Sequence, residues 1–116
     1  MAPNKPAYRM SEADWQRRVV DTALRTGWMC HHVPPIEAAR GGWFTPEQGH
    51  TGFPDWVFAR DGVVLICELK SETGVVEQNQ KPWLQHLGDH VQVWRPRDWD
   101  TLVYPALTAP RRRRVS

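Results

Sequence analysis

Three residues with side chains suited to phosphate chemistry stand at the ends of two strand-like segments. Asp55 opens the first segment, and Glu68 and Lys70 close the second. Magnesium takes oxygen ligands, usually one or two carboxylates completed by water and a substrate phosphate. A lysine beside the carboxylates can stabilise charge that develops on the phosphate or position the attacking water. Together these residues predict a metal-dependent hydrolytic site.

The turn between the two segments fixes how they pair. Asp61-Gly62, a strong two-residue hairpin signal, joins residues 55–60 to residues 63–70. With these two residues as the turn, Asp55 comes directly opposite Glu68, at a Cβ separation of roughly 4.5–5.5 Å. Lys70 points to the same face as Glu68 because strand side chains alternate. Like charges that oppose each other are destabilising, so the pair indicates a bound cation.

The alternative is an ordinary ion pair between Glu68 and Lys70 at a solvated strand end. An isolated Glu-x-Lys is more often of that kind. Here it follows Pro54-Asp55 and ends a strand whose residues 63–67 are apolar on both faces, as in a buried strand. This context favours the functional interpretation.

Two further polar residues stand where helices are expected to begin. Glu12 lies in the first turn of a helix capped by Ser11, on the face that also carries Gln16. It either reaches the rim of the carboxylate pair or only complements the helix dipole. Gln80 lies near the start of the second long helix and either orients water or phosphate or is solvated. Trp83, on the same helix, is expected in the core.

The elements that position these residues form a small mixed α/β fold. Helix, strand, hairpin, helix, strand and helix follow one another, which predicts a central mixed β-sheet flanked by helices. The expected helices are residues 11–26, 77–87 and 98–103. The expected strands are residues 28–33, 55–60, 63–70 and 91–94, of which the second and third form the hairpin. Residues 36–51 are expected to form a long loop, in which Trp43 and Phe44 are available to a partner subunit or to nucleic acid.

The chain of 116 residues is one domain long. We divide it into a flexible N-terminal lead at 1–10, a single domain at 11–106 and a basic tail at 107–116. The formal net charge is +2, but the run Arg111, Arg112, Arg113 and Arg114 holds four of the fifteen basic residues, which leaves the rest at −2. Such a run is either a solvated tail or a tether for nucleic-acid phosphates.

Several classes of protein are disfavoured. There is no stretch of about 18 apolar residues and no secretory signal, so a cytoplasmic protein without a membrane span is expected. Two cysteines, Cys30 and Cys67, fit a reducing compartment. A metal cluster built on Cys30, His31, His32 and His50 is disfavoured because the spacing matches no strong zinc motif.

Pro54-Asp55, a gap of twelve residues and then Glu68-Leu69-Lys70 make the chain resemble the PD-(D/E)XK nuclease superfamily. The match is closest to its VRR-NUC branch, the virus-type replication-repair nucleases, and covers roughly residues 11–103. The remaining matching blocks are residues 11–28, 52–56, 71–72, Gly74, Gln80, 83–84, 93–96 and 98–99.

The resemblance implies a restriction-endonuclease-like core and a role for each matched residue. Asp55 and Glu68 would be metal-binding carboxylates, with the Leu69 carbonyl as a further ligand and Glu12 completing the metal site. Lys70 would be the catalytic lysine, and Gln80 the glutamine that follows the core motif. The cofactor would be Mg²⁺, for which Mn²⁺ is expected to substitute. The segment between His32 and Gly52 is longer and richer in Gly and Pro than the family pattern.

The expected function is therefore metal-dependent hydrolysis of phosphodiester bonds in DNA, by a structure-selective endonuclease of the junction or flap type. The resemblance also implies a homodimer and a phage or mobile-element origin. One alternative is a non-cleaving module with a nuclease fold that binds DNA ends or junctions. Cleavage of RNA is another, because nothing in the sequence separates the two nucleic acids.

Overall fold

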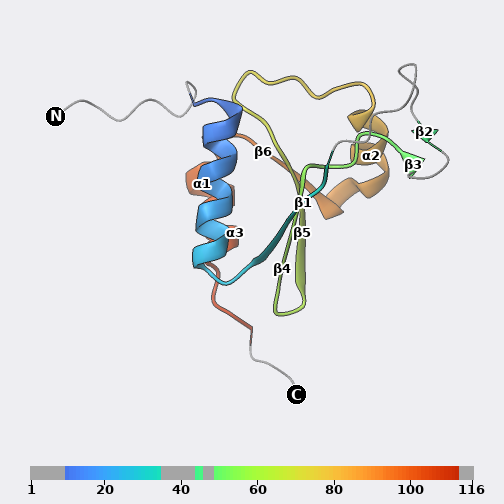
Figure 1. Cartoon of the computed structure of the whole chain (residues 1–116). Helices are drawn as coiled ribbons and strands as arrows, with labels where there is room; N and C mark the ends of the chain where they lie inside the picture. Colours follow the sequence, from blue (N-terminus) through green and yellow to red (C-terminus); the bar gives the residue numbers. More distant parts are fainter. Residues whose placement is uncertain (1–9, 35–43, 46–48, 113–116) are drawn as a thin grey trace.

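The computed structural model describes residues 10–34, 44–45 and 49–112, and the expected lead and the end of the expected tail lie largely outside this part. Within it the chain has a mixed α/β fold, with a four-stranded mixed sheet, a two-stranded sheet and three α-helices (Figure 1). The helices are α1 (Glu12–Arg25), α2 (Gln80–Leu87) and α3 (Tyr104–Thr108). The strands are β1 (Met29–His32), β2 (Phe44–Thr45), β3 (Gly49–His50), β4 (Trp56–Arg60), β5 (Val63–Leu69) and β6 (Val91–Trp94).

The main sheet has the strand order β1-β4-β5-β6. The pairs β1–β4 and β4–β5 are antiparallel, whereas β6 returns parallel to β5 after α2. The predicted register of the hairpin is confirmed, since Arg60 pairs with Val63 and Val57 with Ile66. Asp61 and Gly62 both have positive φ, 53° and 83°, as a two-residue hairpin turn requires.

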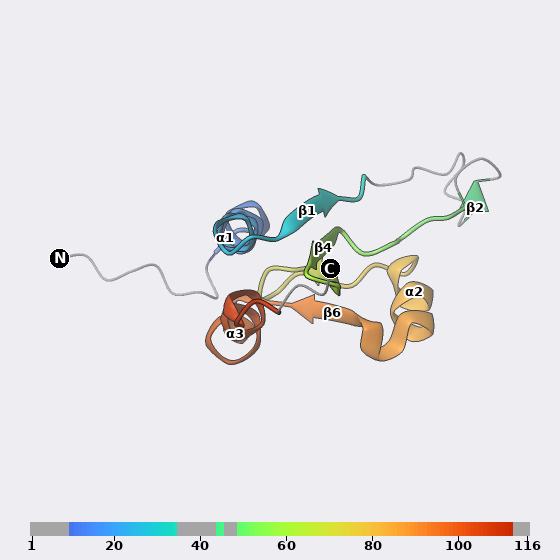
Figure 2. The same ribbon diagram turned by 90° about the horizontal axis from the view of Figure 1, so that it is seen from below.

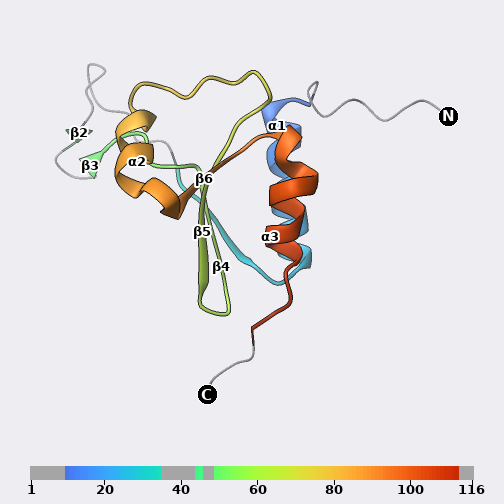
Figure 3. The ribbon, with the colours of Figure 1, turned by 180° about the vertical axis from the view of Figure 1, so that it is seen from behind.

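Helices lie on both faces of this sheet. Figure 2 shows α1 and α3 together on one face and α2 on the other, and Figure 3 shows the same layers from behind. The apolar stripe of α1 supplies Trp15, Val19 and Ala23 to the core, all fully buried. The other residues of the core cluster are Trp28, Phe58, Cys67, Leu69, Trp94, Val103 and Leu107. The hydrophobic core therefore fills the space between the sheet and the α1–α3 layer.

The start of α1 agrees with the prediction from nearby residues, and the start of α2 does not. As predicted, Ser11 caps α1, because its Oγ accepts a hydrogen bond from the Asp14 backbone N–H at 3.0 Å. The second helix begins at Gln80, three residues later than expected. The backbone N–H of Gln80 donates to Glu77 in a tighter turn, and Pro82 lacks the N–H that would continue an α-helical ladder to residue 78.

The C-terminal helical region is longer than expected. A 3₁₀ turn at Pro96–Asp98 and a π turn at Trp99–Val103 lead into α3. Leu107 is fully buried, and its carbonyl oxygen accepts a hydrogen bond from the Trp28 indole at 2.9 Å. The packed part of the chain thus continues beyond residue 106, where we placed the end of the domain.

The expected loop at 36–51 contains the small β2–β3 hairpin in the part that the structure describes, while residues 36–43 and 46–48 lie outside it. Trp43 is one of the residues that lie outside the described part of the chain, so its expected role stays a prediction. Among the described helices, none is long and apolar enough to cross a membrane.

Candidate active site

Asp55 and Glu68 are neighbours, as the hairpin register predicts. Asp55 immediately precedes β4, whose first residue, Trp56, pairs with Cys67. The backbone N–H of Asp55 donates a hydrogen bond to Glu68 Oε1 at 3.1 Å. The residue before β4 and the end of β5 therefore hold two carboxyl groups in direct proximity.

Besides the Asp55 backbone N–H, two further polar groups contact the buried Glu68 carboxylate, and they belong to Gln80 and Lys70. Glu68 is only 1% exposed, and its Oε2 accepts a hydrogen bond from Gln80 Nε2 at 2.7 Å. The Lys70 Nζ lies 3.4 Å from the same oxygen. Gln80 is itself oriented, because its Oε1 accepts a hydrogen bond from the Glu77 backbone N–H at 2.8 Å. Asp55, Glu68, Lys70 and Gln80, all singled out from the sequence, thus meet at one place.

The electrostatics of this cluster favour a proton or a cation on the carboxylates. Burial, then the nearby charge of Asp55 and a hydrogen bond with its carboxyl group, raise the pKa of Glu68 to about 7. The hydrogen bond from Gln80 and the charge of Lys70 act in the opposite direction. Because ligands bind metals in the deprotonated form, a cation here would take the place of the proton.

A cavity of about 210 Å³ lies beside the carboxylates. It is lined by Val33, Pro34, Gly52, Phe53, Asp55, Glu77, Asn79 and Gln80. Gly52 shapes it: its φ is +90°, and a Cβ at this position would stand 2.2 Å from the Asn79 carbonyl oxygen. Only glycine allows the segment before Asp55 to lie this close to the start of α2.

The donor set suits a hard divalent cation. Two carboxylates offer oxygen ligands, and Mg²⁺ is usually bound by one or two carboxylates with water and substrate phosphate. Among the described residues no group of three or more His, Cys, Asp or Glu side chains is placed to hold a metal ion. The carboxylates of Asp55 and Glu68 would therefore depend on water and substrate for the remaining ligands. Leu69 is buried at the end of β5, and a role for its carbonyl oxygen stays a prediction.

Glu12 is not brought into such a group. It is exposed in the first turn of α1. One turn further on, Gln16 Oε1 accepts a hydrogen bond from the Trp56 indole at 3.3 Å, and Trp56 follows Asp55 in the chain. This contact turns the Glu12 face of α1 toward the start of β4, whereas metal binding by Glu12 stays a prediction.

The arginine tail starts at the other end of the sheet. Arg111 forms a two-point ion pair with Asp61 in the β4–β5 turn, with both N···O distances 2.9 Å. Arg112 is exposed, and Arg113 and Arg114 lie outside the described residues. The described part of the tail is therefore remote from the carboxylates, and nucleic-acid binding by these arginines stays a prediction.

Sequence reasoning missed the role of Arg95. The guanidinium donates hydrogen bonds to the carbonyl oxygens of Ser71, Glu72 and Gly74, so it fixes the loop that follows Lys70. The contact depends on the parallel pairing of β5 with β6, which places the ends of the two strands side by side. No local pattern around residue 95 signals it.

Comparison with known proteins adds no relative. No family model, no curated protein and no solved structure matches the chain.

Proposed function

We propose that this protein is a metal-dependent endonuclease of the PD-(D/E)XK type that hydrolyses phosphodiester bonds in DNA. The observation that carries the proposal is the buried carboxylate of Glu68, set against Asp55 and contacted by Lys70 and Gln80 beside a cavity. Burying like charges side by side is destabilising, and a bound cation offsets that effect. The resemblance to VRR-NUC nucleases leads to the same proposal.

Each member of the cluster has a distinct task in this reaction. A Mg²⁺ ion bound by Asp55 and Glu68, or Mn²⁺ in its place, would lower the pKa of a water and neutralise charge on the scissile phosphate. Lys70, held 3.4 Å from Glu68, supplies positive charge to the phosphate oxygens as charge develops there. Gln80 and the Asp55 backbone N–H each hold one oxygen of Glu68 and so fix the direction of its carboxylate.

The fold supports the finer proposal of a restriction-endonuclease-like core. A mixed sheet with α1 and α3 on one face and α2 on the other is the arrangement that the resemblance implies. We place its action in the cytoplasm, including the host cytoplasm if the protein is phage-encoded, where both free cysteines, Cys30 and Cys67, stay reduced.

The proposal also includes a homodimer. The described residues that favour it are exposed apolar side chains of the sheet, since Met29 of β1 and Val64 of β5 are 78% and 58% exposed. Sedimentation of the full chain at several concentrations tests this part separately, and a monomer at every concentration would refute it.

One observation favours a second candidate, a non-cleaving module that binds DNA ends or junctions. The oxygens of Glu68 already have protein partners in the Asp55 N–H, Gln80 and Lys70. A network satisfied in this way is able to persist as structure alone, without a cation.

A cleavage assay decides between the two candidates. Labelled four-way junction, flap, duplex and single-stranded DNA, with a matched RNA strand, are incubated with Mg²⁺, with Mn²⁺ and with EDTA. Asp55→Ala and Lys70→Ala are compared with the parent and with Lys81→Ala, which alters an exposed lysine on α2. We expect metal-dependent products that disappear in the first two variants and persist in the third. Tight binding without products from any substrate would favour the binding module.

A further inference from the structure

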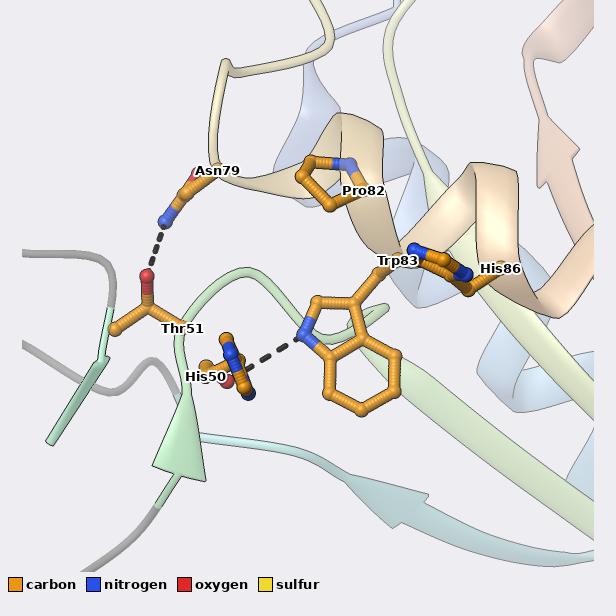
Figure 4. A pocket seen from close by; sticks show the side chains of 6 residues that line it. All are labelled: His50, Thr51, Asn79, Pro82, Trp83 and His86. Carbon is orange, nitrogen blue, oxygen red and sulfur yellow. Dashed lines mark hydrogen bonds between the residues drawn. The ribbon is translucent and has the colours of Figure 1, made fainter. Parts of the chain in front are cut away.

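A second cavity adjoins the candidate active site along α2. It has a volume of about 290 Å³ and is lined by His50, Thr51, Asn79, Pro82, Trp83 and His86 (Figure 4). Asn79 lines this cavity and the one beside Asp55, so the two recesses are neighbours. The volume is close to the lower end of the range for small-ligand sites, about 300–1,000 Å³.

A row of aromatic contacts includes His50 and Trp83 of this cavity and continues to Phe53, near the carboxylates. Phe44, which is 52% exposed, makes an edge contact with His50 at a ring separation of 4.9 Å. The indole of Trp83 donates a hydrogen bond to the His50 carbonyl oxygen at 3.4 Å and meets Phe53 edge-on at 4.8 Å. Phe53 stands two residues before Asp55.

Trp83 is not a core residue, contrary to the expectation from helix periodicity. It is half-buried on the α2 side of the sheet, whereas the buried core lies on the α1–α3 side. Figure 4 shows the indole between His50 and His86, at the cavity wall. Its hydrogen bond and its contact with Phe53 hold the ring in place, so a planar ligand would lose little free energy to ordering it.

We propose that this cavity binds an unpaired nucleobase of the DNA substrate close to the scissile phosphate, an inference that rests on the proposed nuclease function. Stacking on aromatic side chains suits single-stranded DNA, because every base has a π face. A base paired and stacked inside a duplex cannot enter such a recess. The preferred substrate is therefore DNA with an unpaired nucleotide beside the cut, such as a flap or a single strand, rather than continuous duplex.

The test measures binding of the full chain in EDTA, so that no cleavage is needed. The probes are a fluorescent single strand, a flap, a continuous duplex and a set of single strands in which one abasic nucleotide is moved along the sequence. We expect the single strand and the flap to bind more tightly than the duplex. An abasic nucleotide at one position should weaken binding about tenfold.

Variants show whether Trp83 is the stacking partner. Trp83→Leu should weaken binding of the intact strand about tenfold and remove the effect of the abasic nucleotide, because both changes delete the same contact. Phe44→Ala, at an exposed position, should weaken binding without affecting folding. The matched control is Tyr104→Leu on α3, an exposed aromatic on the opposite face of the sheet, which should retain the full abasic effect.

The outcomes separate this inference from the nuclease proposal. If Trp83→Leu keeps the same abasic effect as the parent, or if no abasic position matters, the base-binding cavity is refuted, whether or not DNA is cleaved. If position-dependent binding is found but Mg²⁺ and Mn²⁺ support no cleavage, the cavity stands and the nuclease proposal fails. Circular dichroism of each variant verifies that it is folded.

Discussion

Gln80 Nε2 lies 2.7 Å from Glu68 Oε2, and this hydrogen bond connects the first turn of α2 to the end of β5 that is far from the hairpin turn. Both side chains are buried, at 9% and 1% exposure. The contact stabilises the charged form of Glu68, against the effect of burial and of Asp55. The amide therefore helps to set the pH at which the carboxylate becomes available to a cation.

Replacing Gln80 should shift the pH dependence of cleavage. Gln80→Ala removes a hydrogen bond that lowers the pKa of Glu68, so the acid limb of the rate profile should move to higher pH. At pH 7 we expect a loss of about tenfold, equivalent to about one pKa unit. The measurement is kcat/KM from pH 5.5 to 9, with Gln85→Ala as the control from the exposed side of α2. Equal profiles for both variants would contradict this role.

The stability of the metal-free protein should fall as the pH rises from about 4.5 to about 7. The folded state raises the pKa of Glu68 from 4.5 to about 7, so between these values it binds more protons than the unfolded state. The free energy of unfolding then decreases with increasing pH. Thermal melts in EDTA measure this slope, which Glu68→Gln should reduce, and added Mg²⁺ should raise the melting temperature mainly at pH 8. If the melting temperature of the parent instead rises with pH in this window, relative to that of Glu68→Gln, the prediction is contradicted.

Gly52→Ala should be more harmful than an equivalent change in the hairpin turn. Gly52 and Gly62 both have positive φ, but only at Gly52 does a Cβ collide with backbone, at the Asn79 carbonyl oxygen. We expect Gly62→Ala to cost about 1 kcal/mol of stability through φ alone. Gly52→Ala should cost at least twice as much and also lower cleavage, since it displaces the segment before Asp55. Urea denaturation of the two variants compares these effects.

Removing the arginine tail should alter DNA binding but not the chemistry. Deletion of residues 111–116 should flatten the plot of log K against log salt, by about 0.9 for each lost phosphate contact. The single-turnover cleavage rate at saturating DNA should remain that of the full chain. Arg111→Ala alone should change the slope less, because Arg111 is paired with Asp61. Equal salt slopes for the full and shortened chains would show that the tail does not contact DNA.

Local rules predicted the parts of the structure that depend on near neighbours in the sequence. Asp61-Gly62 defined the turn, and the turn defined the register that brings Asp55 to Glu68. The Ser11 cap followed in the same way from residues within one helical turn. The meeting of two carboxylates was therefore predictable without knowledge of the tertiary structure.

Features that depend on distant contacts were not predictable. Trp83 has the spacing of a core residue, yet α2 packs it against Phe53 and the β3 strand instead. Leu107 enters the core because α3 continues the C-terminal helical region, despite Pro105 at the first turn. In both cases the packing partners are at least thirty residues away or belong to an element that sequence periodicity did not reveal.

The ion pair between Arg111 and Asp61 sets a minimum length for a DNA that engages both ends of the protein. Seven residues separate Asp61 from Glu68 along β5. At about 3.3 Å per residue the tail leaves the sheet roughly 20 Å from the carboxylates. A duplex rises about 3.4 Å per base pair, so roughly six base pairs must extend beyond the cut before the tail has phosphates to contact. Oligonucleotides shorter than this should be insensitive to the tail, and the protected footprint should be asymmetric about the cleavage site.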